Sequence, residues 1–320
     1  MTPLLLPLLS AAAAAVADPG YWQALRLVDT RMATIAWRLQ TGNAALCRQL
    51  QPAAGFQIHA VDQYAGESDA RRVFGFVTPV QVEVVAPDSP AARAGVEADD
   101  GLEAVNGQPV AAPTAKSAGT SLTRDAANAL IARQPADKPL VLTLRRAGKP
   151  LTVTVPASPG CRSAFEVLLG PGLKASSDGR IVQVGVRFFE TLPDDKIAAV
   201  VAHELSHTVL NHRPRLEAAG VQWGLLSEFG RNGRLFRRTE DDADRLSVHL
   251  LRNAGYDPQA AVRFWREDGE QVDGGLFRGP SHGSAKARAA AIAAEVATLP
   301  AHGVPDDAPP VLATRDQPLS

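Results

Sequence analysis

PDDKIAAVVAHELSHTVLNH, residues 193–212, has the pattern of an apolar α-helix and contains the motif H-E-x-x-H at 203–207. On a helix, side chains four residues apart lie on one face, so His203 and His207 can reach the same metal ion. Glu204 is displaced around the helix, where its carboxylate can act as general base on a water molecule. Burying this set of polar side chains without a metal would be costly. The stretch therefore predicts a zinc site with Glu204 as general base.

A third protein ligand is expected, because a catalytic zinc site uses three protein ligands and keeps one position open. The candidates lie in the acidic stretch EDDAD at 240–244. Glu240 comes three residues before the buried stripe of the next helix, which is formed by positions 243, 247, 250 and 254. We therefore predict Glu240 as the third ligand and Asp244 as a hydrogen-bond acceptor for a ligand imidazole. The alternative, an exposed acidic helix start, fits Asp241 and Asp242 better.

Residues 71–157 have a different texture, in which short alternating strands are separated by turn signals. The segments SPAARAG at 89–95 and DDGLEAVNG at 99–107 resemble a PDZ domain of the bacterial protease type. The resemblance implies that a peptide carboxylate or an extended strand docks beside the second strand, under a glycine-containing loop. The matching loop is formed by Phe74, Gly75, Phe76 and Val77. The alternative is a spacer that binds nothing.

The remaining segments resemble the CAAX-prenyl-protease-like zinc peptidases, a family of gluzincins that includes the HtpX-type proteases. The resemblance is carried by LPDDKIAAVVAHELSH at 192–207, DADRLSVHLLRNAGYDP at 242–258 and SHGSAKAR at 281–288. It implies that one Zn²⁺ ion per chain is bound by His203, His207 and Glu240.

The same resemblance assigns roles to two residues of the last motif. It implies that His282 lies near the metal, as a transition-state contact or an extra ligand, and that Arg288 supports the ligands. The family usually has His-Pro where this chain has His282-Gly283. On its own, a histidine in such a Gly/Ser loop is more often simply exposed.

The expected fold class is α+β, a mainly helical zincin-type metallopeptidase domain with a small sheet, interrupted by the PDZ-like β-rich module. Residues 18–70 would form the N-terminal part of the peptidase domain and 71–157 the PDZ-like domain. The zinc metallopeptidase core would follow at 158–300, and a flexible tail at 301–320.

The first seventeen residues resemble a secretory signal peptide, with an apolar stretch that ends in Ala15-Val16-Ala17. We therefore expect a bacterial protein exported to the periplasm or secreted; an uncleaved anchor or a buried N-terminal helix is the alternative. In an oxidising compartment, Cys47 and Cys161 can form a disulfide across the ends of the PDZ-like module. The chain-entropy model values such a long loop at roughly 4–5 kcal/mol. Two buried free thiols are the alternative.

Composition narrows the range of partners. The net charge of -1 and the lack of long basic runs argue against nucleic acid, and no later segment is long and apolar enough to span a membrane. We expect a zinc-dependent endopeptidase of cell-envelope proteins, with protein or peptide substrates and the PDZ-like module for recognition or regulation. One alternative is a zinc-stabilised PDZ chaperone or scaffold with little or no proteolysis. Another is a latent peptidase in which His282 fills the open metal position.

Overall fold

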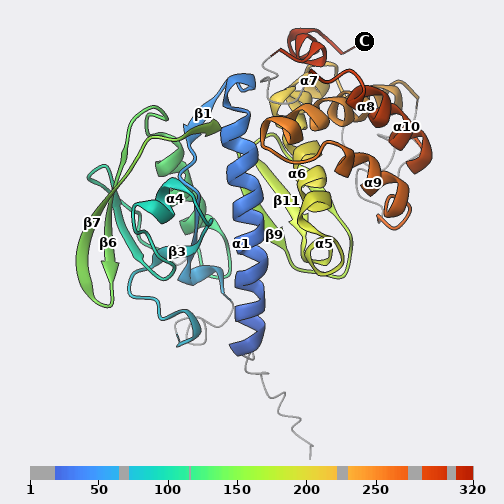
Figure 1. Ribbon diagram of the computed structural model, residues 1–320. Helices are drawn as coiled ribbons and strands as arrows, with labels where there is room; N and C mark the ends of the chain where they lie inside the picture. Colours follow the sequence, from blue (N-terminus) through green and yellow to red (C-terminus); the bar gives the residue numbers. More distant parts are fainter. Residues whose placement is uncertain are drawn as a thin grey trace, which may run out of the picture.

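A long helix, α1 (Pro19–Gly42), separates a β-rich half from a helical half in this mixed α/β structure (Figure 1). The β-rich half comprises residues 53–158, and the helical half comprises 19–52 and 159–319. The structure is a computed structural model that describes residues 19–64, 72–114, 117–221, 230–272, 283–300 and 308–319. The predicted signal peptide at 1–17 lies outside the described residues.

Helix α1 buries two faces, because it packs against both halves. Met32, Ile35 and Leu39 are at most 1% exposed and belong to the core of the helical half. Asp29 and Ala33 lie on the face that looks toward the β-rich half. The first stripe follows from the three-four spacing of apolar residues in the sequence. The second stripe is too polar to be recognised in that way, so only the structure reveals it.

The β-rich half is built on one antiparallel sheet in the order β2-β3-β4-β6-β7, with β5 paired to β4. Its strands are β2 (Phe56–Ala60), β3 (Val80–Val85), β4 (Gly101–Val105), β5 (Gln108–Pro109), β6 (Leu140–Arg146) and β7 (Lys149–Val155). Its described residues also form the helices α3 (Pro90–Arg93) and α4 (Leu122–Ala132) and the 3-10 helix η2 (Val61–Gln63). Helix α4 packs against β2, so the edge strand and this helix lie side by side.

Strand β2 differs from the sequence expectation, which placed it in the N-terminal part of the peptidase domain. In the structure Ile58 pairs with Val82 and Ala60 pairs with Val80, so β2 is the edge strand of the β-rich sheet. Alternation within residues 56–60 predicted a strand, but its partner lies some twenty residues further along the chain. A local sequence pattern does not specify such a distant partner. Because β2 belongs to the β-rich sheet, the β-rich half begins before residue 71, where the sequence analysis placed its start.

The helical half contains a small sheet in the order β10-β11-β9, in which β9 runs parallel and β10 antiparallel to β11. Its strands are β9 (Ala164–Leu168), β10 (Ala175–Ser177) and β11 (Ile181–Gly185). Its helices are α5 (Val186–Thr191), α6 (Asp194–Val209), α7 (His212–Ala218), α8 (Gly230–Asn253), α9 (Gln259–Glu267) and α10 (Ala285–Val296). Helix α6 is central, because it packs against α8, α9 and β10.

The chain enters and leaves the β-rich half through adjacent segments. Strands β1 (Leu50–Pro52) and β8 (Pro159–Cys161) pair antiparallel, and a short 3-10 helix, η1 (Ala44–Leu46), precedes β1. In the structure a disulfide joins Cys47 to Cys161, whose Cα atoms are 5.4 Å apart. The crosslink therefore closes the neck through which the β-rich half is inserted.

Residues 308–319 belong to the segment 301–320 that the sequence predicted to be a flexible tail, and in the structure they pack against the helical half. The 3-10 helix η3 (Pro310–Asp316) places Val311, 1% exposed, in the core of the helical half. Leu319 is 4% exposed and packs against Leu216 of α7 and Phe236 of α8. The Pro- and Asp-rich composition suggested a loose tail, but two docked apolar side chains and hydrogen bonds such as that from Arg315 to the carbonyl of Leu46 hold residues 308–319 against the helical half. Among the described helices, none has the length and apolar character required to cross a membrane.

Candidate functional site

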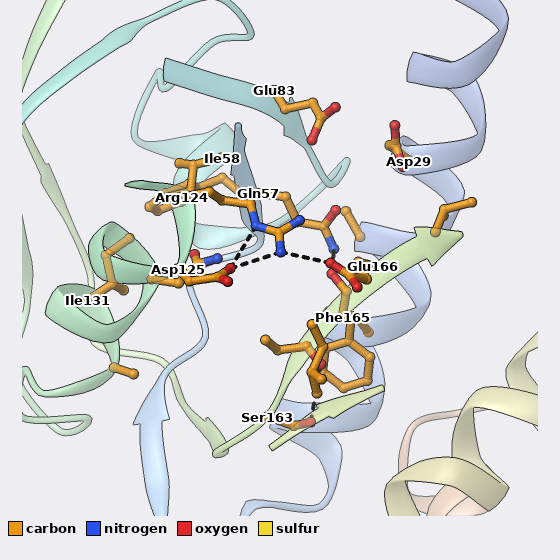
Figure 2. A pocket seen from close by; sticks show the side chains of 18 of the residues that line it. Asp29, Gln57, Ile58, Glu83, Arg124, Asp125, Ile131, Ser163, Phe165 and Glu166 are labelled. Carbon is orange, nitrogen blue, oxygen red and sulfur yellow. Dashed lines mark hydrogen bonds and ion pairs between the residues drawn. The ribbon is translucent and has the colours of Figure 1, made fainter. Parts of the chain in front are cut away.

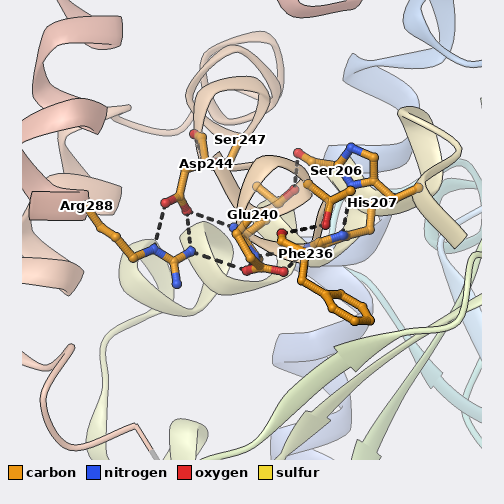
Figure 3. A network of polar contacts seen from close by, with 11 residues as sticks. Ser206, His207, Phe236, Glu240, Asp244, Ser247 and Arg288 are labelled. Carbon is orange, nitrogen blue, oxygen red and sulfur yellow. Dashed lines mark hydrogen bonds and ion pairs between the residues drawn. The ribbon is translucent and has the colours of Figure 1, made fainter. Parts of the chain in front are cut away.

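Two packed helices bring the predicted metal ligands together. Helix α6 carries His203 and His207 one turn apart, and α8 carries Glu240 (Figure 3). Helix α6 ends at Val209, and Asn211 turns the chain in the left-handed conformation with φ of 55°. The side chains of His203 and Glu240 are 5% and 3% exposed, so the two helices enclose the cluster.

The spacing of the ligand atoms fits a tetrahedral metal site. His203 Nε2 lies 3.2 Å from His207 Nε2 and 3.2 Å from Glu240 Oε2, and His207 Nε2 lies 3.4 Å from Glu240 Oε1. Ligands bound to zinc at about 2.0–2.1 Å in a tetrahedron lie about 3.3 Å from one another. Within the described residues, this is the group of histidine and acidic side chains with metal-binding geometry. The cluster could therefore hold a divalent metal with little rearrangement.

Asp244 and Arg288 hold the first histidine in place. Asp244 Oδ1 lies 2.9 Å from His203 Nδ1, which leaves Nε2 for a metal. Arg288 donates two hydrogen bonds of 2.7 Å to Asp244, and its guanidinium lies 3.6 Å from Glu240. The guanidinium also lies over the Trp265 ring, 3.7 Å from its centroid. Asp244 therefore contacts a predicted ligand directly, and Arg288 contacts Asp244; their supporting roles stay a prediction.

His212 holds the second histidine, a role that the sequence analysis did not assign. Its Nδ1 lies 3.0 Å from His207 Nδ1, so the imidazole of His207 also presents Nε2 to the centre. His212 is 1% exposed and begins α7, directly after the left-handed Asn211. The sign of this role in the sequence was that a histidine follows shortly after the helix that carries the metal ligands. Helical spacing excluded it as a ligand and could not show that the turn folds it back.

The electrostatics of the cluster suit a cation. Burial opposes a charge on His203, but hydrogen bonds with Asp244 and Glu240 outweigh this effect and raise the pKa of His203 to about 9. Burial lowers the pKa of His207 to about 4. Burial would raise the pKa of Glu240, but the two neighbouring imidazoles hold it well below its usual range. Burial would also raise the pKa of Asp244, but Arg288 and His203 lower it. The carboxylates of Glu240 and Asp244 therefore stay ionised beside the two imidazoles, an arrangement that attracts a divalent metal.

Glu204 is a buried acidic side chain near the cluster. Its side chain is fully buried, and neither carboxylate oxygen has a hydrogen-bond partner in the described part of the chain. Burial raises the pKa of Glu204 to about 8. A buried polar group without a partner is rare and is expected to have a functional reason. One such reason is that an unpartnered carboxyl group can bind a water molecule or a substrate.

The remaining predicted residues fall in different places. Asp241 is exposed and Asp242 is 7% exposed. The alternative of an acidic helix start is wrong for both, because α8 begins at Gly230, eleven residues before Asp241. Burial raises the pKa of Asp242, although Arg215 nearby opposes this effect. His282 lies outside the described residues, so the structure does not place it relative to the cluster.

A second candidate site is a cavity of about 870 Å³ between the two halves. Its walls come from β2 and α4 on one side and from α1 and β9 on the other. Figure 2 shows Arg124 of α4 reaching across this cavity to Glu166 of β9. The cavity therefore lies beside an edge strand, a geometry in which an extended peptide can pair with the sheet.

The comparison with known families concerns the β-rich half. The family model of the PDZ domain matches residues 81–146, from β3 to the end of β6. Residues 81–146 are a PDZ domain. No curated protein matches the chain. The family match ends before α6 and α8, so the resemblance of the helical half to zinc peptidases stays a prediction.

The glycine-containing loop at the end of the cavity between the two halves differs from the predicted loop, which was Phe74 to Val77. Phe74 lines the cavity, but its ring packs on Trp22, and its carbonyl accepts a hydrogen bond from Gln81. The loop that leads directly into β2 is residues 53–56, with Gly55 at φ of 84°. The Phe74–Val77 segment was predicted to be the peptide-binding loop because it contains a glycine and precedes a predicted strand. That strand, β3, lies inside the sheet and has no free edge for a peptide.

Proposed function

We propose that this protein is a zinc-dependent endopeptidase whose PDZ domain recognises protein substrates. One observation carries the proposal: the ligand atoms of His203, His207 and Glu240 converge at tetrahedral spacing beside the buried, unpartnered carboxylate of Glu204. Structural zinc sites usually have four protein ligands, whereas catalytic sites have three and an open position. Three ligands with an adjacent base therefore favour catalysis over a purely structural role.

The chemistry follows from the positions of the side chains. A zinc ion at this point would supply Lewis acidity, which acidifies water and polarises a scissile carbonyl. Glu204 then accepts a proton from the attacking water and donates it to the leaving amine. Asp244 and His212 bind the Nδ1 atoms of the two histidines and keep both Nε2 atoms directed inward. Because the site is buried, these electrostatic interactions are strong.

Two features support protein substrates of the cell envelope. The PDZ domain provides a surface of the type that binds peptides. The apolar segment at 1–17 favours export, and the disulfide between Cys47 and Cys161 suits an oxidising compartment. Proteins that share this compartment are therefore the proposed substrates.

The purified protein is expected to contain one zinc ion per chain, measured by elemental analysis, and to digest denatured casein. A chelator should abolish digestion, and added zinc should restore it. Glu204→Gln should keep its zinc and lose about 10²- to 10⁴-fold in kcat, since the general base is removed. Glu217→Gln changes an exposed glutamate on α7 and serves as the matched control.

The outcomes separate the peptidase from a zinc-stabilised PDZ scaffold. Undiminished digestion by Glu204→Gln, or full digestion by metal-free protein, would reject the proposed mechanism. A protein that contains zinc and binds peptides, but cleaves nothing even before mutation, would be the scaffold. Both results are decided by metal content and product release, without knowledge of the natural substrate.

A further inference from the structure

The cavity between the two halves is bounded by two edge strands that belong to different sheets. Strand β2 is the edge of the PDZ-containing sheet, and β9 is the edge of the small sheet in the helical half. Both strands line the cavity, and so do α4 and one face of α1. Each strand pairs with its own sheet on one side and faces the cavity with the other. This arrangement offers backbone hydrogen-bonding groups from both walls.

The register of each strand identifies the groups that face the cavity. Val61 donates to Pro79 of the neighbouring segment, so by alternation Ile58 turns its N–H and C=O groups away from β3. Ala164 donates to Arg180, which precedes β11. In a parallel pair the direction alternates, so Val167 turns its backbone groups away from β11. Ile58 and Val167 therefore present free backbone edges to the same cavity.

The two edges are linked through a side chain rather than through paired backbones. Gln57 spans the gap between them with its side chain, whose Nε2 lies 3.5 Å from the carbonyl oxygen of Phe165. The edges are thus too far apart to pair directly. An extended peptide placed between them would lie about 4.8 Å from each edge that it pairs with. One extended peptide would fill the gap and pair with both walls.

The end of the cavity beside β2 is suited to a carboxylate. The loop at 53–56 is buried, and the backbone N–H groups of Ala54 and Gly55 donate to no other group in the described chain. Successive free N–H groups form a concave site that attracts an anion. Trp37 of α1 lies against Gly55, with its Cγ 3.3 Å from the position of an added Cβ. A terminal carboxylate and an apolar last side chain would be accommodated here together.

In this structure an ion pair between Arg124 and Glu166 crosses the cavity. The guanidinium of Arg124 on α4 lies 2.8 Å from Glu166 of β9, and Gln183 of β11 also donates to Glu166 (Figure 2). These side chains of Arg124 and Glu166 are 15% and 17% exposed, respectively. The pair links the PDZ domain to the helical half at the place where a peptide strand would lie. An occupant must therefore separate Arg124 from Glu166.

We propose that the cavity is a composite docking site for the carboxyl end of an extended peptide with an apolar last residue, which pairs with β2 of the β-rich half and β9 of the helical half. The second wall goes beyond binding by a PDZ domain alone, because it makes the helical half part of the recognition site. The Arg124–Glu166 pair is the closed state of this site. The inference rests on the peptide-binding part of the proposed function and requires neither zinc nor cleavage.

The test uses the full chain with Glu204→Gln, so that a bound peptide is not hydrolysed. A library of random nonapeptides with free carboxyl ends is panned on this protein, and the best-retained peptide is synthesised with a fluorescein label. Anisotropy should show at least tenfold tighter binding of the free acid than of its C-terminal amide. Hydrogen exchange followed by mass spectrometry should show that the peptide protects both segments, 56–61 and 164–169.

Variants of the β9 wall give a second readout. Val167→Pro removes an N–H group that faces the cavity, a change that an edge strand tolerates, and should weaken binding at least fivefold. Val167→Ala keeps that group and should bind like the parent. Glu166→Gln weakens the ion pair that the peptide displaces and should tighten binding about two- to fivefold.

Three results would overturn the proposal. They are protection confined to 56–61, equal affinity of Val167→Pro and Val167→Ala with unchanged 164–169 exchange, and a library from which no peptide is retained. Because exchange is measured on the parent protein, the conclusion does not depend on the folding of any β9 variant. Loss of casein digestion, by contrast, concerns only the metal centre.

Discussion

The two metal-binding histidines have different partners, and this difference has consequences at the scale of single residues. His203 is held by the carboxylate of Asp244, whereas His207 is held by the neutral imidazole of His212. A carboxylate makes an imidazole more basic and fixes its orientation more strongly than a neutral acceptor does. Asp244 is in turn fixed by two hydrogen bonds from Arg288. We therefore expect Asp244 to contribute more to metal affinity than His212.

Asp244→Ala should lower zinc affinity by about 10- to 100-fold, the usual cost of losing a group that orients a metal-binding histidine. The change also leaves Arg288 buried without its bidentate partner, which adds to the loss. Zinc affinity is measured by competition with a chromogenic chelator. His212→Ala should weaken zinc binding in the same direction but less.

Asp241→Ala is the matched control for this prediction, because Asp241 is an acid of the same helix with an exposed side chain. It should bind zinc like the parent protein. If Asp244→Ala and Asp241→Ala had the same zinc affinity, Asp244 would not act on the metal through His203.

At the scale of elements, Gly55 decides whether β2 can begin where it does. Its φ is +84°, and an added Cβ would lie 2.2 Å from Ser89 Cβ. Ser89 caps α3 by accepting a hydrogen bond from Ala92, so it cannot move without loss of that cap. Gly55→Ala should therefore lower the free energy of unfolding by about 2–4 kcal/mol, from steric overlap and backbone strain together. Urea unfolding followed by fluorescence measures the change.

Gly75→Ala separates the steric effect from the backbone effect. Gly75 also has a positive φ, of 60°, but an added Cβ would meet nothing within 4 Å. Only the left-handed conformation is then penalised, at about 1 kcal/mol. Equal destabilisation by the two substitutions would contradict the close approach of Gly55 to Ser89. Binding of the selected peptide should be affected by Gly55→Ala and spared by Gly75→Ala.

The elements also show what the sequence could predict. The helix that carries His203 and His207 was predicted because apolar spacing and ligand spacing both have the helical period, and this information is local. The pairing of β2 with β3 and the position of the loop before it depend on contacts between distant residues. The docking of Val311 and Leu319 was missed for the same reason. The role of His212 depends on a left-handed turn at Asn211, which spacing alone does not reveal.

At the scale of the whole molecule, the contact between the halves contains a buried pair of carboxyl groups. Asp29 of α1 shares a hydrogen bond with Glu83 of β3, and burial raises the pKa of Asp29 to about 6 and that of Glu83 to about 8. The pair therefore retains a proton at neutral pH. A contact that buries carboxyl groups becomes weaker when they lose their shared proton, because an ionised group is costly to bury. The halves are thus expected to part at this contact while the disulfide of the neck keeps them joined.

The groups around Asp29 and Glu83 determine how the stability of the protein depends on pH. Arg26 and Arg124 favour ionisation of Glu83, and His59 Nδ1 lies 3.7 Å from Glu83, but burial outweighs these effects. In the unfolded chain both acids ionise near pH 4. The folded protein therefore binds more protons than the unfolded chain between about pH 4 and pH 8, and its stability falls as pH rises through this range.

Glu83→Gln removes the carboxyl group whose pKa is raised further and should flatten this dependence. Between pH 5 and pH 9 the parent should lose about 4 kcal/mol more stability than the variant, because the folded protein holds the proton of Glu83 up to about pH 8 and each pH unit of that range costs about 1.4 kcal/mol. Urea unfolding at both pH values measures the difference, and Trp22, packed on Phe74, reports the contact between the halves. Glu97→Gln, at an exposed glutamate of the same half, should follow the parent curve. Parallel curves for Glu83→Gln and the parent would mean that this carboxyl pair does not hold its proton, and the polar contact would then not govern how the halves separate.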